Sequence, residues 1–183
     1  MPYTAIGLLE FNSIAKGIEA SDAMVKAADV NIVTSHTVCP GKFIVLISGN
    51  VAAVASSVGA GEEISRGFLI DKFIIPNVHP DVFPAITATS KIDILQALGV
   101  IETFSVASTI LASDAAAKAA DVRLIEIRLA NGIGGKSFVS MTGTVADVNA
   151  AVDAGVEMAR TGGLLVSHVV IPQPHPDLKK FTI

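Results

Sequence analysis

Cys39 is the only cysteine in a chain of 183 residues, so its thiol cannot form a disulfide within the chain. A thiol without a partner is expected in a reducing compartment. Thiolates bind soft metal ions, but an iron–sulfur cluster takes three or four of them. One copy of this chain therefore supplies too few cysteine ligands for a cluster.

A second chemical candidate is the segment ANGIGGKS, residues 130–137, which fits a relaxed phosphate-loop pattern if Ala130 replaces the first glycine. A phosphate loop needs a helix directly after its Gly-Lys-Ser, so that backbone N–H groups point at the phosphates. The residues that follow, KSFVSMTG, favour a strand. We therefore interpret the segment as a glycine-rich hairpin, with nucleotide or small-ligand binding as a remote alternative.

Two His-Pro-Asp triplets, His79–Asp81 and His175–Asp177, could suggest a metal site or a proton relay. Each follows a proline-containing segment after a β-rich run, so we expect turns in which His and Asp bond backbone groups. Glu10 and Glu102 end matching β-rich runs, but no nucleophile or general acid is recognisable near them. Their repetition points to shared architecture, and nothing in the sequence supports an enzyme.

Composition narrows the class of protein. Hydrophobic residues make up 51% of the chain and charged residues 16%, which is little charge to cover a monomer. No apolar run is long enough to span a membrane, and the first residues lack a secretory signal pattern. The net charge is −4 without a basic cluster, which argues against nucleic-acid binding. We expect a cytoplasmic protein that hides apolar surface by self-association.

The chain contains an internal repeat. Residues 5–30 align with residues 97–122 without gaps, and 15 of these 26 positions are identical. The offset of 92 becomes 94 at the Gly-Lys pairs and 96 at the His-Pro-Asp triplets, so the halves differ in length only at loops. The chain is a duplication, and we predict domains at residues 1–92 and 93–183.

Each half has the pattern of an α/β protein of the α+β kind, with a ferredoxin-like split βαβ order and both helices packed on an antiparallel sheet. Ser13 is a plausible N-cap for the first helix, and Asp22 and Asp114 precede Lys26 and Lys118 at ion-pair spacing. A short helix is possible after Pro80 in the connecting segment. The expected elements of the first half are strand 5–10, a helix to about 28, strands 31–38 and 43–48, helix 51–65 and strand 68–75.

Two similar halves in one chain can occupy alternate positions of a pseudo-sixfold ring, so three chains would close it. The segment DAMVKAADV from Asp22, the Gly-Lys hairpins and the Ile-Pro-x-x-His segments at Ile75 and Ile171 resemble the bacterial microcompartment (BMC) domain. This resemblance covers nearly the whole chain, twice. It is strongest to tandem-domain, trimer-forming shell proteins, and within them to a propanediol-utilisation shell protein that carries an iron–sulfur cluster.

The resemblance implies a structural shell protein in the bacterial cytoplasm, a pseudohexameric homotrimer that packs laterally against other shell proteins. Lys26 and Lys118 match the lysine at the tile edge. Cys39 matches the ligand of one [4Fe-4S] cluster per trimer at a central pore, with electron transfer across the shell and an encapsulated redox enzyme as a candidate partner. The residues that match the pore loops are Pro40, Gly41, Lys42, Gly132, Ile133, Gly134 and Gly135.

Two points stay open at this stage. The pore could instead conduct small metabolites without any metal. Many members of the family carry an arginine between the Pro and the His of the last motif, whereas this chain has Asn77 with Val78, and Gln173 with Pro174. We therefore expect sheet assembly to depend more on the two lysines.

Overall fold

The computed structural model describes residues 5–178. The chain forms two compact units that divide between Val78 and His79. No helix among the described residues is long and apolar enough to cross a membrane.

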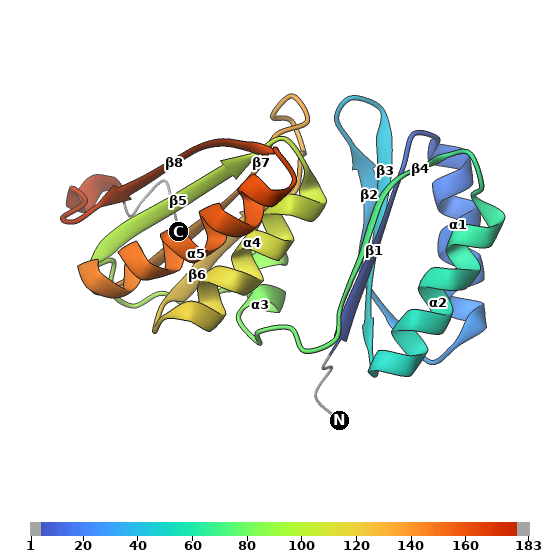
Figure 1. Ribbon diagram of the computed structural model, residues 1–183, viewed down its shortest axis with the longest axis horizontal. Coiled ribbons are helices and arrows are strands. Elements are labelled where there is room, and N and C mark those ends of the chain that lie inside the picture. The colour runs from blue at the N-terminus through green and yellow to red at the C-terminus, as the bar shows by residue number, and fades with distance from the viewer. Residues whose placement is uncertain (1–4, 179–183) are drawn as a thin grey trace. The chain divides into compact units, whose positions relative to one another are not determined.

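The first unit is a four-stranded antiparallel sheet with two helices on one face (Figure 1). Its strand order is β2-β3-β1-β4, so the first strand lies in the middle and pairs with two partners. The elements are β1 (Ala5–Phe11), α1 (Ile14–Ala27), β2 (Asn31–Val38), β3 (Lys42–Gly49), α2 (Val51–Ile64) and β4 (Leu69–Ile75).

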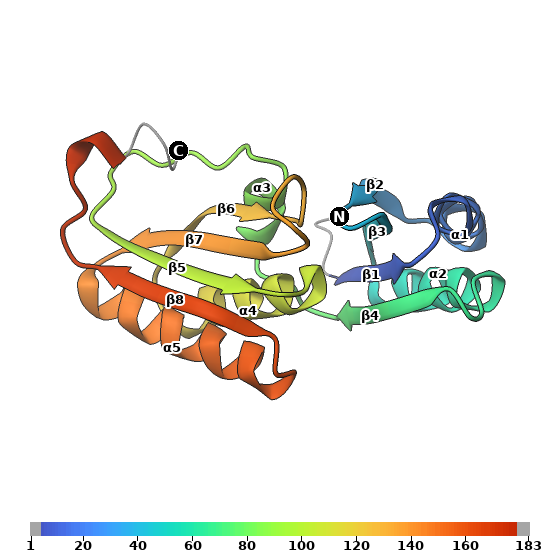
Figure 2. The same cartoon turned by 90° about the horizontal axis from the view of Figure 1, so that it is seen from above.

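The second unit repeats this topology, with strand order β6-β7-β5-β8 (Figure 2). The predicted split βαβ order is therefore confirmed in both halves. The elements are α3 (Val82–Ile86), β5 (Ala97–Thr103), α4 (Val106–Ala119), β6 (Arg123–Arg128), β7 (Ser137–Gly143), α5 (Val145–Thr161), β8 (Leu165–Ile171) and a short 3₁₀ turn at Pro176–Leu178.

Local sequence explains where the helices begin. The Ser13 hydroxyl accepts a hydrogen bond from the Lys16 N–H, as predicted for an N-cap, and Ser105 caps α4 in the same way. The expected strand at 68–75 begins one residue later, because the Phe68 N–H donates to the Ser65 carbonyl and Gly67 has a positive φ of 87°. Phe68 therefore belongs to the turn.

The core of the first unit lies between the sheet and its helices. Leu9 and Phe11 of β1 and Met24 of α1 are fully buried there with valines of α2. At Gly7, a Cβ atom would lie 2.8 Å from a methyl group of Val54, so α2 can approach β1 only because this position is glycine. Gly99 holds the same place against α5 in the second unit.

The connecting segment belongs to the second unit. Its short helix, predicted after Pro80, is α3, which packs on β6 and α4 (Figure 2). Asp81 forms an ion pair with Arg123 of β6, with 2.8 Å between Oδ2 and Nε. These contacts explain why the compact units divide at residue 78, ahead of the boundary predicted at residue 92.

Candidate functional site

Cys39 lies in the tight turn between β2 and β3, and its side chain is partly exposed. The Cys39–Pro40 peptide bond is cis, and Gly41 has a φ of 78°, which favours glycine. A side chain on Gly41 would meet no atom within 4 Å, so the turn is open around that residue. Cys39 is therefore presented by a short turn that is open around Gly41.

The base of this turn is tied to the first strand by an ion pair. Lys42 Nζ lies 2.8 Å from Glu10 Oε1, and the Glu10 side chain is almost fully buried. Because Glu10 lies opposite Ile44 in the sheet, Lys42 is its diagonal neighbour on the adjacent strand. A buried carboxylate needs such a partner, so the pair fixes the hairpin below Cys39.

The second unit repeats this ion pair. Lys136 Nζ lies 2.6 Å from Glu102 Oε1, at the matching strand and hairpin positions. Sequence analysis recognised the two glutamates as shared architecture but missed their lysine partners. The signal was present, because both charges recur at equivalent positions of the duplicated chain.

The glycine-rich loop before β7 is a hairpin. Gly132, Gly134 and Gly135 all have positive φ, and the Lys136 N–H donates to the carbonyl of Ile133. A strand follows directly, so this loop has no helix N-terminus to offer a phosphate. The predicted hairpin is confirmed, and the geometry of a phosphate loop is not present.

The predicted ion pairs on the helices are confirmed. Lys26, in the last turn of α1, lies 2.5 Å from Asp22 Oδ2, and Lys118 of α4 lies 2.6 Å from Asp114 Oδ2. Both lysines remain accessible at the C-terminal ends of their helices, where a positive charge is favourable. Both ammonium groups are therefore accessible to a neighbouring molecule.

The His-Pro-Asp triplets form turns, as predicted. The Asp81 N–H donates to His79 Nδ1 over 3.3 Å, and the Asp177 N–H donates to His175 Nδ1 over 3.2 Å. Within the described part of the chain, no group of three or more His, Cys, Asp or Glu residues could hold a metal ion. Any cluster bound through Cys39 would therefore need ligands from other chains.

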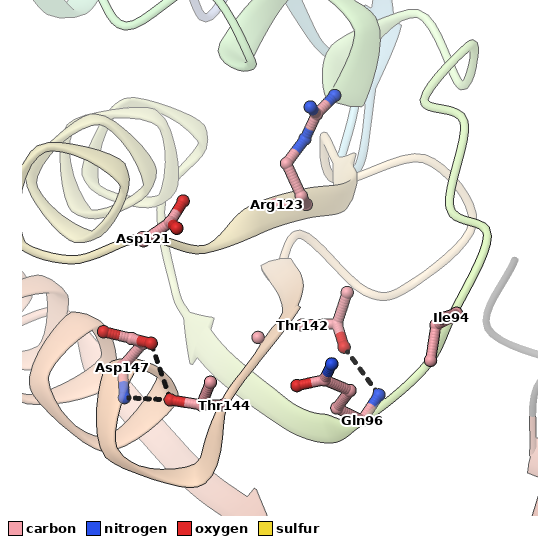
Figure 3. A pocket seen from close by; sticks show the side chains of 8 residues that line it. Ile94, Gln96, Asp121, Arg123, Thr142, Thr144 and Asp147 are labelled. Atoms are coloured by element: carbon pink, nitrogen blue, oxygen red, sulfur yellow. Dashed lines mark hydrogen bonds between the residues drawn. The ribbon is translucent and has the colours of Figure 1, made fainter.

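The second unit contains a pocket of about 250 Å³ between the start of β6 and the end of β7, and most of its lining residues are polar. Figure 3 shows Thr144 and Asp147 bonded to each other in its wall, and Arg123 extending away from them. Because Arg123 pairs with Asp81, its positive charge is already engaged. The pocket offers neither a nucleophile nor a cluster of metal ligands.

His36 lies on β2, close to the cysteine turn in the sequence. Its Nδ1 is 2.8 Å from the Thr34 hydroxyl oxygen, and burial lowers the pKa of its imidazole below the ordinary value. A neutral His36 next to this turn adds no positive charge near Cys39 at neutral pH.

Comparison with known proteins identifies the same kind of domain in both units. The sequence profile of the BMC domain matches residues 5–78 and 97–174. The bacterial microcompartment shell protein PduT of Citrobacter freundii is 47% identical over 174 residues, covering 95% of each chain. The shell protein EutM of Salmonella typhimurium is 44% identical over 86 residues, which is 47% of this chain and 88% of EutM.

Solved structures agree with this result. The crystal structure of a microcompartment protein from Desulfitobacterium hafniense superimposes with a TM-score of 0.93 and 56% identity, over 97% of this chain and 99% of that one. A fused permuted hexameric shell protein of the RMM microcompartment gives a TM-score of 0.63 at 23% identity, over 86% of this chain and 82% of that one, which shows a shared fold.

Proposed function

Because the chain belongs to the BMC-domain family, with one domain in each unit, we propose that it is a shell protein of a bacterial microcompartment and that three copies close a ring of six domains. The observation that carries this proposal is the match of the family profile to both units, each with the same sheet order. Two equivalent domains per chain suit alternate positions of a ring. The protein would lie in the microcompartment shell, within the bacterial cytoplasm.

The proposed ring would carry a [4Fe-4S] cluster at its centre, held by Cys39 of three subunits. The residues fit this role in number and kind. One thiol per chain becomes three around a threefold axis, which meets the need of a cluster for several thiolates. The turn that presents Cys39 is short, accessible and anchored by the Lys42–Glu10 pair.

A bound cluster would supply one-electron transfer, which could link the two sides of the shell. The chain's own residues provide the ligand and its orientation: Cys39 binds, Pro40 and Gly41 set the direction of the turn, and Lys42 holds its base. The loop Gly132–Lys136 of the second domain would alternate with this turn around the pore. An encapsulated redox enzyme is the partner that this function would require.

Lateral packing against other shell proteins would use Lys26 and Lys118. Both lie at helix ends, carry an accessible ammonium group and recur in the two domains. Identical edges on a flat ring produce a sheet when they pack side by side.

The cluster proposal is tested by purifying the protein without oxygen and measuring its visible absorption, iron and acid-labile sulfide. We expect a brown protein with about one cluster per trimer, as three thiolate ligands per site require. The Cys39→Ser variant should lose colour, iron and sulfide while its native mass stays that of a trimer.

A matched control is Ser35→Ala, which removes a hydroxyl of the same hairpin that lies 3.3 Å from the Ser21 hydroxyl of α1, and should keep the cluster. If the anaerobic trimer is colourless and free of iron, the cluster is absent and the metal-free pore for small metabolites replaces it. If wild-type protein is a monomer at high concentration, the shell-tile proposal itself is wrong.

A further inference from the structure

One contact inside the second unit suggests how chains join. The backbone N–H of His79 donates to Asp114 Oδ1 of α4 over 2.8 Å, while Oδ2 of the same carboxylate binds Lys118. The segment that begins at His79 continues into α3, which also packs on α4. A His-Pro-Asp turn is thus docked on a helix through a buried carboxylate.

Both partners of this contact, the turn and the helical aspartate, occur a second time in the chain. The turn at His175 has the conformation of the turn at His79: the Val82 N–H donates to the His79 carbonyl, and the Leu178 N–H donates to the His175 carbonyl. In both turns the histidine Nδ1 accepts the N–H two residues later. The equivalent of Asp114 is Asp22 of α1, whose Oδ2 binds Lys26.

The helix and turn that form the internal contact are more buried than their equivalents elsewhere in the chain. Asp114 has a side chain 11% exposed, against 61% for Asp22. An apolar stripe on the same helix face follows this difference: its three members are nearly fully buried on α4 and exposed on α1. The α4 residues are Val106 (1%), Ile110 (0%) and Ala117 (5%), and their α1 counterparts are Ile14 (41%), Ile18 (56%) and Val25 (38%).

The two turns also differ in burial, but here the earlier turn, at His79, is the more buried one. Val82 is fully buried and its counterpart Leu178 is half-buried, and the Asp81 side chain is 16% exposed against 63% for its counterpart Asp177. One chain therefore presents an exposed face on α1 and a more exposed second turn. Head-to-tail association of identical chains would satisfy both surfaces at once.

We propose that the segment Gln173–Leu178 of one subunit docks on α1 of the next, where Asp22 accepts the backbone N–H of the partner's His175. This inference rests on the proposed trimer and names the contact that closes it. The exposed residues Ile14, Ile18 and Val25 share the face of α1 that carries Asp22 and would border this joint. One difference from the internal contact is that Arg123, the partner of Asp81, is replaced by Asn31, so the joint depends more on Asp22 and the stripe.

Thiol cross-linking tests this contact directly in a Cys39→Ser background. The double variant Asp22→Cys, His175→Cys places one thiol on each side of the proposed joint. The matched control, Asp114→Cys with His79→Cys, places thiols at the contact already present within one chain. With a short bismaleimide, the first pair should give covalent dimers and trimers on a denaturing gel, and the control pair should stay at monomer mass.

A second measurement separates Asp22 from its ion pair. Because a hydrogen bond to a charged group is lost, Asp22→Ala should weaken trimer association by about tenfold or more in sedimentation equilibrium. Asp22→Asn keeps an acceptor oxygen and should recover part of this loss. Lys26→Ala removes only the ion pair and should leave association near the wild-type value.

The outcomes distinguish the joint from the trimer. If the native mass is that of a trimer, the control pair reacts and the Asp22–His175 pair gives monomers only, then this joint is wrong and the proposed function stands. A wild-type protein that stays monomeric would overturn both.

Discussion

Gly17 and Phe43 form a matched pair of small and large residues beneath α1. A Cβ atom on Gly17 would lie 2.7 Å from Cγ of the Phe43 ring, well inside contact distance. In the second domain the equivalent positions hold Thr109 and Ser137, both fully buried. The first domain therefore has a small residue on the helix and a large one on the strand, whereas the second domain has a larger residue on the helix and a smaller one on the strand.

This exchange predicts strong coupling between the two positions. Helix propensity alone would make Gly17→Ala stabilising by about 1 kcal/mol. The overlap with the Phe43 ring should reverse this and cost about 1–3 kcal/mol in the free energy of unfolding. In a Phe43→Ala background the same change should lose its penalty, as urea unfolding of the four proteins of the cycle would show.

A Gly17→Ala effect that is equal in both backgrounds would contradict the coupling. The comparison also guards against a general effect of alanine on α1, because that effect would appear with and without the ring.

His36 predicts a pH dependence of stability. Burial lowers the pKa of its imidazole in the folded protein below the value of the unfolded chain. The unfolded state therefore binds more protons as the pH falls through and below the ordinary histidine range of about 6.5, and stability declines there. Above that range this contribution is fully present. His36→Gln should flatten the fall in unfolding free energy between about pH 7.5 and pH 5.5.

His168→Gln is the control for this measurement, because His168 is exposed on β8 and lies in the other domain. If the wild type and the His36→Gln variant lose the same stability on acidification, other groups control the effect.

At the scale of elements, glycines determine how closely the helices pack. A Cβ on Gly61 of α2 would lie 2.7 Å from both Leu9 Cδ1 and Met24 Cγ. On Gly155 of α5 it would lie 2.9 Å from the Ala112 carbonyl oxygen of α4. A side-chain methyl can move aside, whereas a helix carbonyl moves only with its helix.

Three alanine substitutions should therefore rank in a fixed order. Gly59→Ala, on the exposed face of α2 with nothing within 4 Å, should stabilise by about 0.5–1 kcal/mol. Gly61→Ala should destabilise by about 1–3 kcal/mol, and Gly155→Ala by more. Thermal unfolding of the three variants measures this, and a Gly61→Ala protein as stable as Gly59→Ala would contradict the close packing of α1 and α2.

Much of the secondary structure was predictable from the sequence. Hydrophobic alternation, Ser13 and the duplicated pattern predicted the strands and long helices of the first half to within about two residues, because those signals are local. The Lys42–Glu10 pair was not predicted, because it depends on which residues face each other across two strands distant in sequence. Asp114 was assigned to an ion pair only, since its second bond, to His79, depends on how the connecting segment folds back.

At the scale of the whole molecule, composition predicted apolar surface that association would hide. Such surface is present on the single chain, for example at Ile18 of α1 and Phe104 after β5. Sequence alone could not divide exposed from buried copies of the α1 stripe, because the two helices carry similar residues. Only the fold shows that the stripe is buried on α4 and exposed on α1.

Sheet formation should depend on Lys26. Its ion pair with Asp22 is exposed, and such pairs contribute less than about 1 kcal/mol, so Lys26→Ala should leave unfolding and trimer mass unchanged. If Lys26 packs tile against tile, each trimer loses three edge contacts together and extended sheets should disappear in electron micrographs of concentrated protein.

Lys16→Ala is the matched control, because Lys16 is on the same helix, carries the same charge and pairs with Glu19 at 2.7 Å. Sheets that survive Lys26→Ala as they survive Lys16→Ala would remove Lys26 from the edge and leave the lateral contacts to Lys118 or to other residues of the ring.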